Sequence, residues 1–129
     1  MMPKMSLSVN VDRDSYLTEL ARARTFCFEH EVAYLKSQGL AQGGSLKNAI
    51  VIGKDKFNTN AEGHRFPDEF VRHKILDLIG DLTLIGRPLL KMHIEAERLG
   101  HAHNVEFAKL LDIAARTLRK SKTKILEVK

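Results

Sequence analysis

Residues 65–82 read RFPDEFVRHKILDLIGDL, and this stretch decides the fold that the sequence predicts. Pro67 suits the first position of a helix, where its missing N–H is not needed, and the two acidic residues after it favour the first turn. Apolar residues then recur at steps of four and three, which is the spacing of one helical face: Val71, Ile75, Leu78, Leu82 and Ile85. Gly86 and Pro88 end the pattern. The stretch therefore predicts a long amphipathic helix.

The rest of the chain predicts shorter elements around this helix. Strands are expected where apolar and polar residues alternate or where a short apolar run occurs, and helices where apolar residues return every three or four positions. We expect strands at 7–11, 49–52 and 92–97, and helices at 15–22, 26–38 and 104–119, the last with Phe107, Leu111, Ala114 and Leu118 turned inward. This order predicts an α+β fold, a small sheet covered on one face by helices.

Composition narrows the class of protein. The chain has 129 residues, 43% of them apolar, which fits one globular domain. Its net charge of +5 is partly due to the basic tail at 119–129, and a solvated surface explains that charge as well as a phosphate-bearing or membrane partner does. No nucleic-acid-binding signature is present. Cys27 is the single cysteine, which suits a reducing cytoplasm, and no apolar run approaches the roughly 20 residues that span a bilayer.

Three polar residues of the long helix have the spacing of a metal site. His73, Asp77 and Asp81 follow one another at intervals of four, so His73 and Asp77 stand one turn apart and can reach one zinc ion. The same spacing is common on solvated helix faces, and two ligands are fewer than a catalytic zinc usually has. His101, after Gly100, can act as a general acid, or it is only a polar residue at a helix start.

Four strings in this order resemble one enzyme family, the zinc-dependent UDP-3-O-acyl-N-acetylglucosamine deacetylases of lipid A biosynthesis. They are ARTF at 23–26, LKSQGLAQGGSLKNAIVI at 35–52, RFPDEFVRHKILDLIGDL at 65–82 and GHAHN at 100–104. The resemblance covers residues 6–118 and is to the second of the family's two α+β domains. It implies hydrolysis of the N-acetyl group of a UDP-linked acylated sugar in the cytoplasm, with Zn²⁺ as cofactor.

The resemblance also implies a role for individual residues. His73 and Asp77 match two zinc ligands, His101 matches the catalytic histidine, and Asp81 matches the carboxylate that holds it. Thr25 matches the hydroxyl that faces the reacting carbonyl. The substrate-binding positions that it implies are Lys74, Phe26, beside the acyl passage, and Gly44. Cys27 and Lys47 depart from the residues usual in the family, without removing any of these positions.

The same resemblance predicts that the chain is a second domain without its first. On this interpretation residues 1–118 form the domain and 119–129 a basic tail or linker remnant, which in some bacteria leads to a fused 3-hydroxyacyl-carrier-protein dehydratase. The third zinc ligand and the general-base glutamate are expected in the missing N-terminal domain, which is the predicted partner. Two alternatives stay open, a catalytically inactive fragment and a binding module of the same fold.

Overall fold

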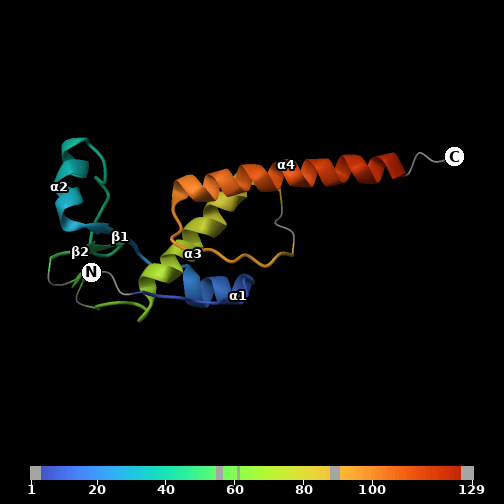
Figure 1. Cartoon of the computed structure of the whole chain (residues 1–129). Helices are drawn as coiled ribbons and strands as arrows, with labels where there is room; N and C mark the ends of the chain where they lie inside the picture. The colour runs from blue at the N-terminus through green and yellow to red at the C-terminus, as the bar shows by residue number, and fades with distance from the viewer. Residues whose placement is uncertain (1–3, 55–56, 61, 88–90, 126–129) are drawn as a thin grey trace. The chain divides into compact units, whose positions relative to one another are not determined.

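The structure is a computed structural model that describes residues 4–54, 57–60, 62–87 and 91–125. The chain forms two compact units, which meet within one helix: the first unit runs to Leu76 and the second begins at Asp77. In chain order the elements are α1, the π-helical turn η1, β1, α2, β2, β3, α3, the 3-10 turn η2 and α4 (Figure 1). This is the α+β class that the sequence predicts.

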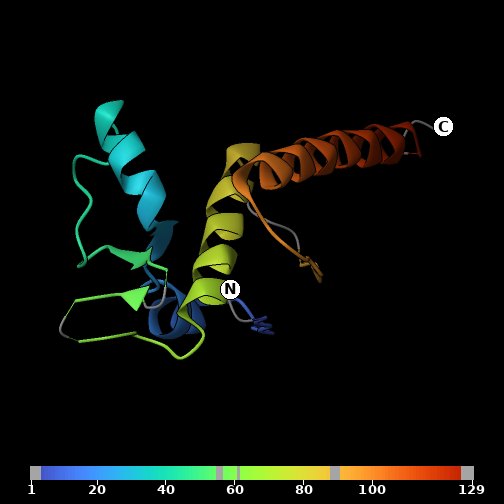
Figure 2. The same cartoon turned by 60° about the vertical axis from the view of Figure 1, so that its left-hand side comes forward.

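A three-stranded sheet organises the first unit. Its strands are β1 (Thr25–Phe28), β2 (Ala49–Ile52) and β3 (Phe57–Asn58), in the order β1-β2-β3. β1 and β2 are parallel, with Thr25 opposite Ala49, and β3 is antiparallel to β2. Because parallel neighbours need a crossover, the chain leaves β1 and passes through α2 (Glu29–Ser37) before it returns to β2 (Figure 2).

The core of the first unit lies where β2 meets the start of α3 (Glu69–Leu82). Ile50, Ile52 and Phe70 form a buried cluster, with Met5 and Phe26 packed against it. The helical turns before β1, α1 (Arg13–Ser15) and η1 (Tyr16–Leu20), contribute the fully buried Leu20. The first turn of α3 therefore packs against the strands, so the first residues of α3 lie close to β1.

The second unit pairs the end of α3 with the last helix. η2 (Thr83–Ile85) continues α3, and Gly86 ends it in the left-handed region at φ 70°, as the sequence predicts. α4 spans His101–Ile125, and its first turns pack on α3 through a cluster of Leu78, Leu82 and Ala108. Ile85, Ile94, Leu99, Phe107 and Leu111 pack around that cluster.

Several predicted elements differ from the structure. The strands expected at 7–11 and 92–97 are absent among the described residues, where both segments are irregular chain, because alternating side chains give no strand unless a neighbour pairs with the backbone. The helix expected at 26–38 begins at Glu29, since 25–28 pair with β2. α4 begins three residues before the predicted start. The sequence also predicts that Pro88 stops the helix. Pro88 itself lies outside the described chain, which has a gap at residues 88–90.

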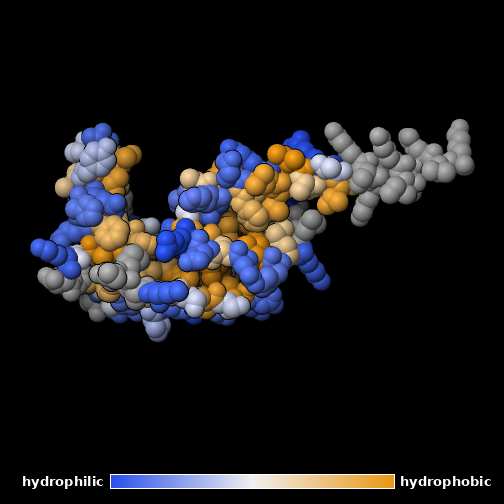
Figure 3. Space-filling view, in the orientation of Figure 1, coloured by the Kyte–Doolittle hydropathy of each residue, from blue (hydrophilic) through white to orange (hydrophobic). Residues whose placement is uncertain are grey.

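Apolar side chains are exposed along α4, where Figure 3 shows them in orange. Leu110 and Ile113 are each 61% exposed. Ala114 and Leu118, which the sequence places inward, are exposed as well. Among the described side chains of α4, those in its first turns are therefore the ones covered within its own unit. No helix in the described part of the chain combines the length and the apolarity required to cross a membrane.

Candidate active site

The residues expected to form an active site divide between the two units. Thr25, Phe26, Gly44, His73 and Lys74 belong to the first unit, and Asp77, Asp81 and His101 to the second. Each group is described within its own unit. His73 and Asp77 are both residues of α3, which is one continuous helix from Glu69 to Leu82.

In the first unit, Phe26 is the centre of a small group of contacts. Its ring meets that of Phe70 edge-on with 4.9 Å between centroids, and its centroid lies 6.2 Å from that of His73. Lys74 places Nζ 5.3 Å from the Phe26 centroid, which is cation–π distance. The strand β1 thus lies against α3, and its second residue, Phe26, is close to His73 and Lys74, which are both predicted site residues.

Thr25 and Gly44 lie outside that group of contacts. Thr25 is the exposed first residue of β1. Gly44 lies in the exposed loop between α2 and β2, where its N–H donates to the Ala41 carbonyl at 3.0 Å. A Cβ at position 44 would come within 3.0 Å of that same carbonyl oxygen. A larger residue at position 44 would therefore crowd this turn.

The backbone before β1 orients the His73 ring. Its Nδ1 lies 3.1 Å from the carbonyl oxygen of Ala23. A carbonyl only accepts, so this contact is a hydrogen bond when Nδ1 carries the proton. Histidines that bind metals commonly donate their second ring N–H to a carbonyl in this way. The contact with Ala23 is thus of the kind that orients a metal-binding histidine.

In the second unit, His101 and Asp81 form a hydrogen-bonded pair. His101 is the first residue of α4, and its Nδ1 lies 2.8 Å from Oδ2 of Asp81. The other ring nitrogen, Nε2, is 4.0 Å from Oδ2 of Asp77. The His101 side chain is 67% exposed, whereas that of Asp81 is only 18% exposed. A carboxylate that fixes one nitrogen of an accessible imidazole leaves the other able to give or take a proton.

Asn104 is a member of this group that the sequence analysis missed. It is 1% exposed, and its Nδ2 donates to Asp81 Oδ2 at 2.9 Å. The available signal is a polar residue three positions after His101, on the helical face that also carries Phe107 and Ala108. An asparagine on an inward face needs a polar partner, and Asp81 provides it.

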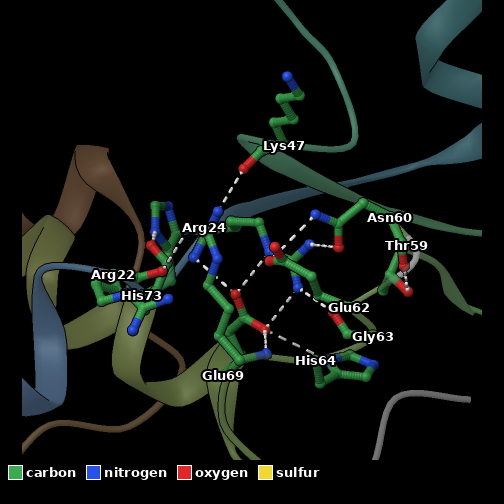
Figure 4. A network of polar contacts seen from close by, with 12 residues as sticks. Arg22, Arg24, Lys47, Thr59, Asn60, Glu62, Gly63, His64, Glu69 and His73 are labelled. Carbon is green, nitrogen blue, oxygen red and sulfur yellow. Dashed lines mark hydrogen bonds and ion pairs between the residues drawn. The ribbon is translucent and has the colours of Figure 1, made fainter.

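A buried ion pair supports the first unit beneath β1. Arg24 and Glu69 are 2% and 0% exposed, with Nε 2.8 Å from Oε1 and Nη2 3.0 Å from Oε2 (Figure 4). The backbone N–H groups of Arg24 and Arg65 also donate to the Glu69 carboxylate. The remaining guanidinium donors of Arg24 bind Leu46 O, Asn60 Oδ1 and Gly63 O. The pair thus ties β1, two loops and the start of α3 together.

This network determines the charge of Glu69. Burial by itself raises the pKa of the carboxyl, but the side chain of Arg24 and the N–H groups of Arg24 and Arg65 outweigh burial and hold the pKa at about 2, below the ordinary 4.5. From the sequence, Glu69 is expected only to stabilise the first turn of the long helix as an acidic residue. Its main partner is 45 residues away in the chain, so sequence spacing gives no sign of the pair.

We expect the stability of the chain to fall on acidification because of Glu69. Its pKa is lower in the folded than in the unfolded chain, so the contribution is complete above about pH 4.5 and is lost as the pH falls toward 2. A shift of this size corresponds to about 3 kcal/mol. Urea unfolding followed by circular dichroism across this pH range measures it. The Glu69→Gln chain should show a shallower pH dependence, and an unchanged slope would contradict the assignment.

The described residues contain no group of three or more histidine, cysteine, aspartate or glutamate side chains placed to hold a metal ion. The two side chains predicted to bind a metal ion are the imidazole of His73 and the carboxylate of Asp77. Both are ligand types that zinc accepts, and the Ala23 carbonyl is a partner of the kind that metal-binding histidines have at their second ring nitrogen. The residues present therefore fit two ligands of a zinc ion.

Comparisons of this chain with known proteins all lead to the same protein family. The model of the LpxC family, UDP-3-O-acyl N-acetylglycosamine deacetylase, matches residues 1–112. A UDP-3-O-acyl-N-acetylglucosamine deacetylase of Chromobacterium violaceum is 54% identical over 99 residues, which are 77% of this chain and 32% of that protein. Those of Sulfurimonas denitrificans and Myxococcus xanthus are 48% and 56% identical, over 88% and 72% of this chain and 42% and 29% of theirs.

The chain thus spans about a third of the length of the curated relatives that it matches. The family match includes all the candidate site residues described above, from Thr25 to Asn104. The sequence resemblance, over residues 6–118, and the family match, over residues 1–112, name the same family. The chain belongs to the UDP-3-O-acyl N-acetylglycosamine deacetylase family.

Proposed function

We propose that residues 1–118 form the second domain of a zinc-dependent deacetylase, and that residues 119–129 are a basic tail. The proposed reaction removes the N-acetyl group from UDP-3-O-acyl-N-acetylglucosamine, the substrate and reaction that the names of the relatives give for those proteins. We place this reaction in lipid A biosynthesis, as the sequence resemblance implies. The lone Cys27 suits a reducing compartment, and we extend the proposal to the cytoplasm.

The observation that carries the proposal is the hydrogen bond between His101 and Asp81. Because Asp81 accepts from Nδ1 at 2.8 Å, Nε2 is the nitrogen that can deliver a proton. In the proposed reaction, water adds to the acetamide carbonyl while a general base takes its proton. Nε2 of the protonated His101 then gives a proton to the nitrogen as the C–N bond breaks. The products are acetate and a free sugar amine.

His73 and Asp77 are the proposed zinc ligands of this domain. They follow each other by one turn of α3, which is the spacing at which two side chains reach one ion. Bound zinc would polarise the amide carbonyl and make water more acidic. A catalytic zinc usually has three protein ligands. We therefore propose that the third ligand and the general base come from a part of the enzyme outside the residues described.

The remaining predicted residues have binding roles in this proposal. The exposed Thr25 hydroxyl at the start of β1 is available to donate to the oxygen on which negative charge develops. Lys74, held over the Phe26 ring, supplies a positive charge near a wall of apolar side chains. Gly44 lets the loop before β2 turn closely. Together they suit a substrate with an anionic and an apolar part.

The proposal predicts that this chain alone does not deacetylate the UDP-sugar. With only two metal ligands and no general base, the expected turnover is at the background rate. Activity should appear when the chain is joined or mixed with the N-terminal half of a relative such as the Chromobacterium violaceum enzyme. Release of free amine, measured with and without added Zn²⁺, tests this.

The control is the same mixture with the zinc-ligand variant His73→Ala, which should stay inactive. Turnover by the isolated chain would contradict the proposed division of ligands. Absence of turnover in a mixture that demonstrably forms a complex would contradict the proposed function itself.

A further inference from the structure

The side chain of Asn104 shares an acceptor with the proposed catalytic imidazole. Its Nδ2 lies 2.9 Å from Oδ2 of Asp81, and Nδ1 of His101 lies 2.8 Å from the same oxygen. The Asn104 backbone N–H donates to Gly100 O at 3.0 Å, in the first turn of α4. Both donors thus reach Asp81 from one helical turn, three residues apart.

The two donors differ sharply in burial. Asn104 is 1% exposed, whereas the side chain of His101 is 67% exposed. An exposed imidazole can rotate into solvent, but a buried amide is held by the packing around it. Asn104 therefore determines the rotamer of the Asp81 carboxylate, and the carboxylate in turn determines the ring orientation of His101.

The other amide atom of Asn104 argues against a purely structural role. Its Oδ1 is buried, and no hydrogen-bond partner for it exists in the described part of the chain. A buried acceptor without a partner is unfavourable. An apolar residue of the same size would avoid this penalty, so the position is not optimised for stability. What only asparagine supplies here is the N–H that meets Asp81.

We infer that Asn104 is a positioning residue that holds Asp81 in the orientation required to fix the proton of His101 on Nδ1. The inference rests on the proposed function of His101, because Nε2 must then be the nitrogen facing substrate. Asn104 itself has no contact with reacting atoms.

The test is the tautomer of His101 in the isotopically labelled chain, read from long-range ¹H–¹⁵N correlation spectra at alkaline pH, where imidazoles are neutral. The wild-type ring should be mainly in the Nδ1–H form. Asn104→Leu removes both the donor and the buried acceptor at similar volume. It should keep the fold and reduce the ratio of Nδ1–H to Nε2–H at His101 by about fivefold or more, since a bond to a charged group is lost.

Two controls separate positioning from general damage. The tautomer of His30, which stacks on Phe28 in the first unit, should not change. Asn104→Asp keeps the shape but replaces the donor by an acceptor, so it should disturb His101 at least as much as Asn104→Leu. Circular dichroism reports whether each variant is folded.

An unchanged His101 tautomer in the folded Asn104→Leu chain would overturn the inference. So would unfolding of both variants, because that would make Asn104 a structural residue. The measurement needs neither zinc nor turnover, so its failure differs from a failure of the proposed deacetylation. If the joined enzyme is active, Asn104→Leu should lower kcat while KM changes little.

Discussion

Replacing Arg24 with alanine is expected to destabilise the chain by about 3–5 kcal/mol, the usual effect of removing one partner of a buried ion pair. Glu69 would keep the backbone N–H groups of residues 24 and 65 as donors, with His64 Nδ1 3.6 Å from Oε2 and its charge still buried. The carbonyls of Leu46 and Gly63 would lose their donors as well. Loss of the pair should therefore loosen β1, the neighbouring loops and the start of α3 together.

Urea unfolding followed by far-ultraviolet circular dichroism measures this loss. Arg116→Ala is the matched control, because Arg116 also donates through Nε to a carboxylate, that of Asp112 at 2.7 Å, but is 68% exposed. An exposed pair contributes about 0–1 kcal/mol, so the control should differ little from wild type. Equal effects of the two substitutions would show that burial of Arg24 has no energetic consequence.

Replacing His101 with alanine is expected to lower kcat of the joined enzyme by about 10²–10⁴-fold, the range typical of a lost general acid. Without Nε2 the departing amine would lose its proposed proton donor, while the substrate contacts proposed for Thr25 and Lys74 would remain. KM should therefore change much less than kcat. Asp81→Asn should lower kcat too, because an amide can present its N–H to Nδ1 and so favour the wrong tautomer of His101.

Steady-state rates of free-amine release at several substrate concentrations separate these effects. The control is His103→Ala, which removes an exposed imidazole two residues along α4 and should leave the rate close to wild type. Unaltered kcat in His101→Ala would exclude His101 as the proton donor. A loss of equal size in the control would point to damage of α4.

The sequence predicted the elements whose signals are local. α3 carries an apolar stripe, and Gly86 ends the helical segment as expected. β2 is a short apolar run between turn residues, and the structure has it at the predicted residues. The strand β1 was missed because Phe28 also fits a helical period, and only pairing with Ile52 decides the matter.

The candidate site residues also divide into those that local spacing predicts and those that depend on distant contacts. His73 and Asp77 are one turn apart in sequence, so their relation on a helix could be stated beforehand. Asp81 and His101 were connected by family resemblance alone, and their functional roles stay predictions although the side chains are hydrogen-bonded. Asn104 and the Arg24–Glu69 pair were missed, because what makes them important is burial beside a distant partner, which no local pattern encodes.

The parallel pairing of β1 with β2 has a consequence for how this domain can change. Everything from Glu29 to Asn48 is an excursion between two strands whose register is set elsewhere, by ladder hydrogen bonds and by the ion pair beneath them. Loop closure depends only weakly on length. A graft that shortens, lengthens or exchanges the part of this excursion that contains α2 should therefore leave Thr25 in place.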